Sequence, residues 1–249
     1  MKQTLIPLVS LLLGASLSTG LAASIFDIFK RAPAANSVSL ASLSNEQIVS
    51  GLKEALAKGV THAVTNLGRP DGFLKDAQVK IPMPEPLLRV DKTLRMLQQG
   101  QLADEFVATM NHAAEQAVPQ AAVVLVDSVK QMSLADAKAI LTSTNTAATD
   151  YFRRTSQTTL HDRFLPIVKE ATAKTGVTAA YKRMTEGAHM GEIGTMLLGL
   201  NNFDLDEYIT RKSLDGLFVK IAEQEKLIRE NPVARTTELL QKVFGAIGK

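Results

Sequence analysis

Residues 204–231 read DLDEYITRKSLDGLFVKIAEQEKLIREN, and this stretch decides the fold because it is apolar on two sides. Wound at helical pitch, its apolar residues fall into two sets on nearly opposite faces. One set contains Leu205, Tyr208, Ile209, Val219 and Leu227, and the other contains Leu214, Leu217, Phe218, Ile221 and Ile228. A helix that is apolar on two sides packs against neighbours on both. We therefore predict a central helix from Leu205 to Asn231, started by an Asp204 cap, in which a close helix crossing compensates for Gly216.

The chain on either side of this helix has helical periodicity and helix start signals. Ser44 and Gln47 form a capping box, and Ser133 and Asp136 form another. Gly68 is placed to end the first helix in a left-handed conformation. The apolar run at 121–126 is interpreted as a buried helix in preference to a strand. The predicted further helices cover about 44–67, 86–97, 102–117, 119–132, 133–141, 147–154, 156–174, 177–186 and 233–244, with an irregular Gly- and Met-rich segment at 187–200.

One long stretch resists helix formation, and it reads GRPDGFLKDAQVKIPMPEP from Gly68 to Pro86. Its prolines lack a backbone N–H and push the preceding residues toward extended geometry. We predict an edge strand or extended strap that locks the first helix to the second. Its apolar plugs would be Phe73, Leu74, Val79, Ile81 and Met83. An alternative interpretation makes the charged residues of this ordered loop a partner-binding rim; they are Arg69, Asp71, Lys75 and Lys80.

The first 43 residues have the pattern of a leader and a tether. A cationic start is followed by an apolar run from Leu5 to Leu17 and by small residues at Ala22 and Ala23, as in a secretory signal peptide. The run is short for a membrane anchor, which is the alternative. We expect cleavage near Ala22/Ala23, export to a bacterial periplasm, a flexible tether at 24–43 and one all-helical domain at 44–249. Membrane contact would be at most peripheral, through the apolar and basic segment at 25–31.

Composition excludes several classes of protein. The 249 residues carry 28 Lys plus Arg against 25 Asp plus Glu, a balance too even for a nucleic-acid groove. There is no cysteine, which rules out disulfides, thiolate nucleophiles and cysteine-ligated metals. The sequence contains no GxSxG, Walker, GxGxxG or HExxH motif. We expect no cofactor.

Two His/Glu pairs have a spacing found in di-metal bundles. His112 and Glu115 are three residues apart, as are Glu186 and His189. A di-metal bundle needs two Glu-x-x-His pairs and two more glutamates on facing helices. The first pair runs in reverse order, and His112 points away from the apolar stripe of its helix. We therefore predict that neither pair binds metal.

Two other places hold candidate polar sites. His161 falls inside an apolar stripe, which favours a hydrogen-bonded core histidine over a general base. Asp215, Arg229 and Arg235 lie near a helix break at Asn231-Pro232 and form a candidate polar pocket, in which an Arg fork would bind an anion. The interpretation that we favour for this group is an inter-helix ion pair and a helix cap, since ion-pair networks are the commoner use of such residues.

Four stretches carry a resemblance to a known family. They are DGFLKDAQVKIPMPEPLLRV at 71–90, MNHAAEQAVPQA at 110–121, ATDYFRRTS at 148–156 and DLDEYITRKSLDGLFVKIAEQEKLIRENPVARTTELLQKVFG at 204–245. From about Ser44 to Gly245 the chain resembles an exported bacterial family, domain of unknown function four-one-nine-seven. The resemblance implies an exported all-helical domain and no particular activity, ligand or catalytic residue. Some relatives have a lipoprotein cysteine after the leader, and this chain has none.

These observations favour a fold and leave function open among three classes. We predict an all-α fold, a single bundle of about nine or ten helices around a central buried helix, with one extended proline-rich strap. The leading hypothesis is a non-catalytic binding or interaction module of the cell envelope, whose partner is an envelope protein or a small ligand. The alternatives are a hydrolase or lyase that uses His161 or the Asp215/Arg235 region, and a carrier whose hydrophobic ligand lies under the segment from Met190 to Leu200.

Overall fold

The computed structural model describes residues 44–189, 191, 203–235 and 237–245, all within a compact unit that spans Val38–Lys249. Over these residues the chain forms helices and turns and no strand, which confirms the predicted all-α class. The leader at 1–23, the tether at 24–43 and most of the predicted irregular segment (190 and 192–200) lie outside the described residues. The described α-helices are α1 (Asn45–Leu67), α2 (Leu88–Met96), α3 (Gly100–Ala117), α4 (Ala121–Gln131), α5 (Leu134–Thr142), α6 (Ala147–Thr175), α7 (Val177–Gly187), α9 (Leu205–Glu230) and α10 (Glu238–Gly245).

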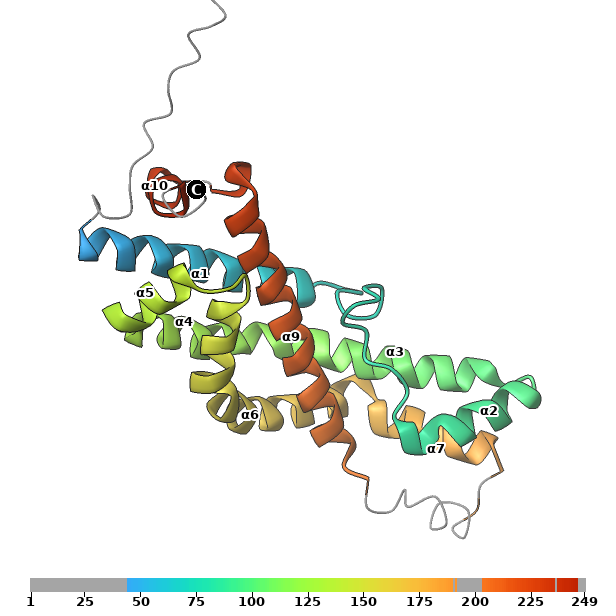
Figure 1. Ribbon diagram of the computed structural model, residues 1–249. Helices are drawn as coiled ribbons and strands as arrows, with labels where there is room; N and C mark the ends of the chain where they lie inside the picture. Colours follow the sequence, from blue (N-terminus) through green and yellow to red (C-terminus); the bar gives the residue numbers. More distant parts are fainter. Residues whose placement is uncertain (1–43, 190, 192–202, 236, 246–249) are drawn as a thin grey trace, which may run out of the picture. The chain divides into compact units, whose positions relative to one another are not determined.

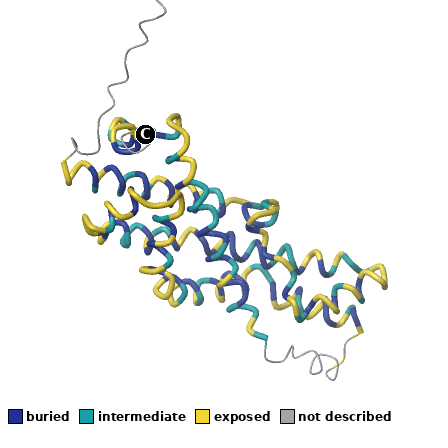
Figure 2. The backbone as a smooth tube through the Cα atoms, in the orientation of Figure 1, coloured by how far each residue is buried: buried dark blue, intermediate teal, exposed yellow. Residues whose placement is uncertain are grey.

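Helix α9 is central, as its two apolar faces predict. It packs against α6, α1 and α3, and its place among them can be followed in Figure 1. Along each helix buried and exposed stretches alternate (Figure 2), as amphipathic helices require. Leu214, Leu217 and Phe218 are all buried, whereas Leu227 is 45% exposed near the end of the helix. The Asp204 side chain accepts a hydrogen bond from the Glu207 N–H, so the predicted cap is present.

The segment Gly68–Pro86, called the strap from here on, is extended and turn-rich, with no strand. Phe73, Val79 and Ile81 are buried, so the predicted plugs are largely confirmed. Its neighbours differ from the prediction: its anchoring contacts run to α3 and α9. A Cβ built on Gly216 of α9 would lie 2.8 Å from Phe73 Cε1 and 3.2 Å from Val79 Cβ. Gly216 therefore permits a close approach of the strap to α9, where we had predicted a helix crossing.

Three local predictions are corrected. The predicted helices at 147–154 and 156–174 form one continuous helix, α6, and Ser156 is buried within it and bonded to Ser128 of α4. A serine whose hydroxyl bonds sideways to another helix does not start a new one. Val123 of α4 is 60% exposed, so that helix is buried on one side only. Gly68 has φ −80°, in the right-handed region, and its small size is explained by Pro119, whose Cγ would lie 2.9 Å from an added Cβ.

The remaining helix boundaries lie close to the predicted ones. Both predicted capping boxes, at Ser44 and Ser133, are formed. Gly176 ends α6 with φ 74°, in the left-handed region that glycine adopts most readily. The last helix begins later than predicted, because Val233 belongs to a 3-10 turn and is 86% exposed. Among the described helices, none combines the length and apolar character needed to span a membrane.

Candidate functional site

The strap is held by two buried polar side chains of α3. The Glu115 carboxylate, 5% exposed, accepts hydrogen bonds from the N–H groups of Asp71, Phe73 and Leu74 at 3.1, 3.0 and 3.2 Å. Asn111, fully buried, accepts from the Ile81 N–H at 2.8 Å and donates to the Ile81 carbonyl at 2.9 Å. These bonds satisfy backbone groups that an irregular segment would otherwise bury without partners. Glu115 and Asn111 thus have a structural role that the sequence reasoning missed.

The first His/Glu pair, His112 and Glu115, lies beside the strap. Glu115 points into the strap, whereas His112 is 43% exposed with its Nε2 3.7 Å from Asp71 Oδ1. Glu115 therefore binds backbone N–H groups of the strap, whereas His112 faces the side-chain carboxylate of Asp71. Glu186 of the second pair is exposed and lies 3.8 Å from Lys182. Over the described residues, no three His, Asp or Glu side chains gather as metal ligands would.

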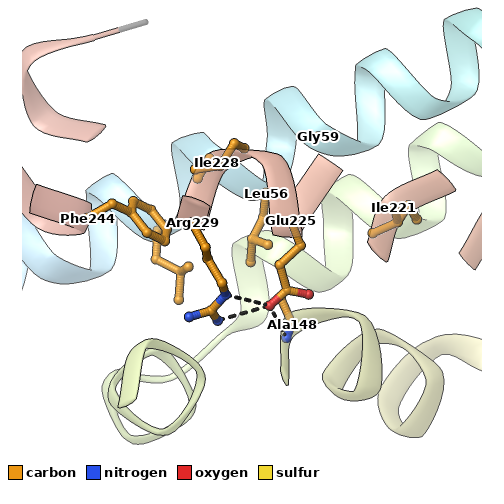
Figure 3. A pocket seen from close by; sticks show the side chains of 10 residues that line it. Leu56, Gly59, Ala148, Ile221, Glu225, Ile228, Arg229 and Phe244 are labelled. Atoms are coloured by element: carbon orange, nitrogen blue, oxygen red, sulfur yellow. Dashed lines mark hydrogen bonds and ion pairs between the residues drawn. The ribbon is translucent and has the colours of Figure 1, made fainter. Parts of the chain in front are cut away.

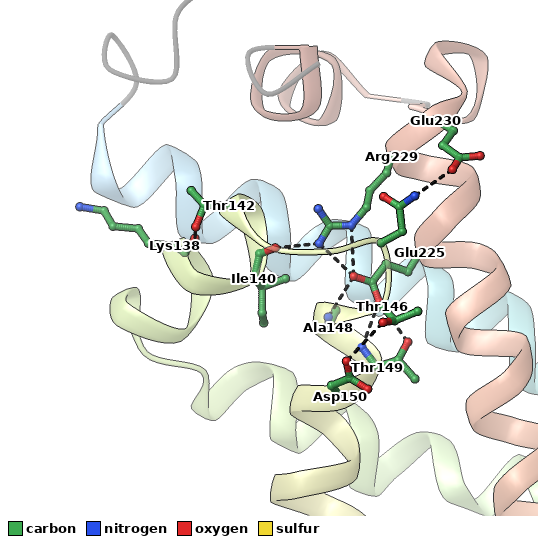
Figure 4. A network of polar contacts seen from close by, with 11 residues as sticks. Lys138, Ile140, Thr142, Thr146, Ala148, Thr149, Asp150, Glu225, Arg229 and Glu230 are labelled. Carbon is green, nitrogen blue, oxygen red and sulfur yellow. Dashed lines mark hydrogen bonds and ion pairs between the residues drawn. The ribbon is translucent and has the colours of Figure 1, made fainter. Parts of the chain in front are cut away.

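A second buried carboxylate belongs to Glu225 of α9, and it caps the start of α6. It accepts hydrogen bonds from the N–H groups of Ala148 and Thr149 at 2.9 and 3.0 Å and from the Thr149 hydroxyl at 3.0 Å. Arg229, one turn later, donates to it at 2.9 Å and to the Ile140 carbonyl at 2.8 Å (Figure 4). A carboxylate at a helix N-terminus pairs with the free N–H groups and with the positive end of the helix dipole. This network joins α9 to α5 and α6.

A small cavity adjoins this network between α1, α9 and α10. Figure 3 shows Glu225 and Arg229 at its edge, with Leu56, Ile221, Ile228 and Phe244 around it. Its volume is about 20 Å³, enough for about one water molecule and far below what a ligand needs. We therefore assign this cavity to the packing of the bundle.

The predicted polar pocket of Asp215, Arg229 and Arg235 is divided between two places. Arg235 is 9% exposed and donates to the carbonyls of Ile228 and Arg229 at 3.0 and 2.7 Å, which caps the C-terminal end of α9. Arg229 is bound by Glu225 as described above. Arg235 thus forms the helix cap that we favour for this group, whereas the ion pair of Arg229 with Glu225 lies within α9 and does not join two helices. Asp215 points elsewhere, into a groove between α6 and α9.

The α6/α9 groove is built from two rows of side chains spaced four residues apart. Helix α6 contributes Arg153, Gln157 and His161, and α9 contributes Glu207, Arg211 and Asp215. Residues at this spacing lie on one face of a helix, so the two rows face each other. Thr158, Leu214 and Phe218 complete the lining of the groove, which measures about 450 Å³. That volume is within the range of small-molecule sites, roughly 300–1,000 Å³.

His161 and Glu207 form the polar link across one end of the groove. His161 Nε2 lies 2.8 and 3.0 Å from the two carboxylate oxygens of Glu207, and Nδ1 lies 3.4 Å from Asp162. The hydrogen bond to Glu207 raises the pKa of His161; partial burial opposes this rise and Asp162 adds to it. The imidazole is 33% exposed, so the prediction of a core histidine is wrong. Of the two apolar residues between which it falls in that stripe, Leu165 is half-buried and Val168 is buried.

Two arginines of the groove have donors available. The guanidinium carbon of Arg153 lies 4.5 Å from the centroid of the Phe218 ring, and its nearest carboxylate oxygen, on Asp215, is 3.9 Å away. That separation is too long for a hydrogen bond. Arg211 is exposed and makes no hydrogen bond or ion pair with any residue of the described ranges. The groove thus combines the guanidinium of Arg153 supported on Phe218, the guanidinium of Arg211 with no partner in the described part of the chain, and the His161–Glu207 pair.

The predicted partner-binding rim of the strap is a separate surface. Arg69, Lys75 and Lys80 are exposed, and Asp71 is half-buried. Lys75 Nζ lies 2.7 Å from Asp71 Oδ2, and this bond lowers the pKa of Asp71. The four residues lie on one segment whose backbone is held by α3. That they bind a partner stays a prediction.

Comparison with known proteins identifies a family and nothing more specific. Residues 42–245 match a family model described as "Protein of unknown function (DUF4197)". No curated protein and no solved structure matches the chain.

Proposed function

Because the chain belongs to the DUF4197 family, whose description names no function, we propose a function from the groove: a non-catalytic binding protein that takes a small molecule between α6 and α9. The proposal rests on a groove of about 450 Å³ that is lined by Arg211, a side chain with no hydrogen bond or ion pair to any residue that the structure describes. Polar groups with a structural role are mostly hydrogen-bonded to other groups of the protein. Donors left available in a concave site are suited to a ligand.

We propose that the groove is non-catalytic because His161, the side chain of the groove that could act as a general base, has both ring nitrogens near carboxylates. Both of its ring nitrogens face carboxylates, Nε2 toward Glu207 and Nδ1 toward Asp162. The raised pKa of His161 favours the protonated ring, which has no lone pair with which to accept a proton. We propose that His161 acts as a positioned cation at the end of the groove. The hydrolase or lyase alternative retains one favourable observation, since His161 and Asp215 line the same groove.

We also propose that the protein is exported. The support is the sequence of residues 1–23, with its cationic start, apolar run and small residues before Ala23. Expression of the full chain with its own leader in a bacterium tests this. Recovery in the periplasm, with an N-terminus near Ala23 or Ser24, is expected; a full-length protein retained in the cytoplasm contradicts it.

Native mass spectrometry of the exported protein tests the binding function. We expect an added small-molecule mass on the wild-type protein and its loss from the double variant Arg153→Gln/Arg211→Gln. The matched control is Arg154→Gln, a neighbouring arginine whose side chain lies 3.8 Å from Asp136, outside the groove. An adduct that survives the double variant excludes the groove as its site. Turnover of the released molecule by the wild-type protein, lost in His161→Gln, would replace the binding function by the enzyme alternative.

A partner protein at the strap rim is the second candidate, favoured by a long irregular segment whose backbone is fixed. The double variant Lys75→Ala/Lys80→Ala keeps Glu115 and Asn111 and should leave stability unchanged. Affinity capture with this variant beside the wild type shows whether the rim binds a partner. Identical sets of captured proteins would remove this candidate.

A further inference from the structure

We infer that the groove recognises its ligand by an oxyanion group, a carboxylate or a phosphate, held between Arg153 and Arg211. The inference rests on the proposed function, because it takes the α6/α9 groove to be the binding site. It goes further by naming the chemistry that the ligand must carry and the two side chains that bind it.

Arg153 is oriented before any ligand arrives. Its guanidinium lies over the ring of Phe218, which is 1% exposed and fixed in the core. A guanidinium supported on an aromatic ring keeps the N–H groups at its edge available as donors. Because Asp215 is 3.9 Å away, it attracts Arg153 without taking a short hydrogen bond. The side chain therefore offers a planar set of donors from a buried support.

Arg211 supplies the second set of donors. It lies one turn before Asp215 and one turn after Glu207 on α9, so all three are on the same face of the helix. Among the described residues it has no hydrogen bond or ion pair. Guanidinium groups bind carboxylate and phosphate oxygens through paired, charge-assisted hydrogen bonds, which are stronger than bonds between neutral groups.

The charge balance of the groove favours an anionic group over a cationic one. Both Glu207 oxygens are within 3.0 Å of His161 Nε2, so that carboxylate is directed at the imidazole. With His161 protonated, the lining holds three cations, Arg153, Arg211 and His161, and two anions, Glu207 and Asp215. Because Glu207 is paired with the protonated His161, the two arginines face one remaining carboxylate of the lining, Asp215. A ligand amine, where one is present, would meet Asp215.

The lining also limits the size of the ligand. The volume of about 450 Å³ suits a small organic molecule, and the lining includes two largely buried apolar side chains, Leu214 and Phe218, beside the charged groups. An organic acid, an amino acid or a phosphate monoester satisfies these conditions. Their shared feature is the oxyanion, and the test below separates the sources.

The test is a titration of the full mature protein with defined probes, followed by calorimetry and by the NMR signals of the His161 ring. Succinate and L-glutamate represent carboxylates, and glycerol phosphate represents phosphate monoesters. Putrescine is the cationic probe, and sodium chloride at matched ionic strength is the control. We expect saturable binding of at least one oxyanion probe with a Kd at or below about 1 mM, accompanied by a shift of the His161 signals. The probe class with the lower Kd, carboxylate or phosphate monoester, identifies which oxyanion the groove prefers.

Single variants then assign the binding to the two arginines. Arg153→Gln and Arg211→Gln should each weaken binding at least about tenfold, which corresponds to about 1.4 kcal/mol. Arg153→Lys keeps the charge without the planar donors and should also weaken it. Arg154→Gln should bind as the wild type does. All variants are checked for folding by circular dichroism, and Arg211→Gln is the safer of the two groove variants because Arg211 is exposed whereas Arg153 is half-buried.

Three results would overturn the oxyanion inference. They are binding unaffected by either arginine variant, equal weakening by Arg154→Gln, and no saturable binding of any oxyanion probe. If putrescine or a neutral molecule shifts the His161 signals while oxyanions do not, the groove remains the binding site and only the ligand class is wrong. If no probe shifts them and the periplasmic protein carries no groove-dependent mass, the proposed function fails as well.

Discussion

Helix α9 is contacted by the strap and by α6, and polar groups are used differently at the two contacts. Toward the strap, the Tyr208 hydroxyl donates to the Pro82 carbonyl at 3.0 Å and Lys220 Nζ lies 2.7 Å from Asp76 Oδ2. Behind the strap, Glu115 and Asn111 bind its backbone from α3 and are almost inaccessible to solvent. Along the groove toward α6, by contrast, the polar side chains face each other and remain partly exposed, although Glu225 near the end of α9 is buried against the start of α6.

This difference separates structural polar groups from those available to a ligand. A buried carboxylate or amide is tolerated when backbone partners satisfy it, and removing it leaves those partners unpaired. Half-exposed groups lose little when a partner is absent, because water replaces it. We therefore expect substitutions at the strap contact to change stability strongly and substitutions in the groove to change it little. The predictions below test that separation, beginning with the largest effect.

Replacement of Glu115 by Ala should have the largest effect on stability. It leaves the N–H groups of Asp71, Phe73 and Leu74 without an acceptor, at a cost of about 3 kcal/mol or more. Urea denaturation monitored by circular dichroism measures the loss. Glu105→Ala on the same helix, where Glu105 is exposed and bonded to Arg183, should cost less than about 1 kcal/mol. Equal losses in the two variants would mean that Glu115 does not fix the strap.

Replacement of Asn111 by Ala should cost about 2 kcal/mol, because the N–H and carbonyl of Ile81 both lose their partner. Asn111→Asp keeps the acceptor for the Ile81 N–H and removes the donor to the carbonyl, so it should not restore wild-type stability. The groove counterpart, Arg211→Gln, should change stability by less than about 0.5 kcal/mol. A groove variant as destabilising as Asn111→Ala would remove the distinction between the two contacts.

Much of the fold was predictable because it depends on local signals. The capping boxes at Ser44 and Ser133, the glycine stop at Gly176 and the two-sided pattern of α9 each involve residues close in sequence. The contacts that fix the strap were not predictable in this way. Ile81 is bound by Asn111, thirty residues later in the sequence, and nothing in the sequence of either segment shows that they meet.

The groove was only partly predictable, because the sequence pattern predicts two helices where the structure has the single helix α6. His161 and Asp215 were recognised as candidates, but Arg153, Glu207 and Arg211 were not. Predicting a helix break before Ser156 separated Arg153 from His161, although both lie on one face of the continuous α6. Recognising that Ser156 could bond to another helix would have kept the row intact. The pairing of this row with the row on α9 requires the tertiary structure.

Two glycines of equal chemistry should respond oppositely to replacement by Ala. At Gly216 the new methyl group would lie 2.8 Å from the buried ring of Phe73, so Gly216→Ala should destabilise by about 1 kcal/mol or more despite its better helix propensity. At Gly59 of α1 the nearest atom is Gln224 Cβ at 3.5 Å, an ordinary contact, so Gly59→Ala should stabilise by about 0.5–1 kcal/mol. Thermal and urea denaturation of both variants measures the signs. Stabilisation by Gly216→Ala would show that the strap contact is loose.

The smallest effect, and the one that belongs to the groove, is the pH dependence contributed by His161. Its pKa is raised in the folded state, so its contribution to stability is complete below the unfolded pKa and is lost as pH rises through the folded one. The urea midpoint should therefore fall slightly between about pH 6 and pH 8. The change should stay below about 1 kcal/mol, because the His161 and Glu207 side chains are 33% and 40% exposed.

Glu207→Gln should reduce this pH dependence and His62→Gln should not, since His62 is exposed on α1. A urea midpoint that rises between about pH 6 and pH 8 in the wild type would mean that the folded protein does not stabilise His161 as a cation. The groove would then have no surplus of positive charge, and the charge argument for an oxyanion ligand would fail.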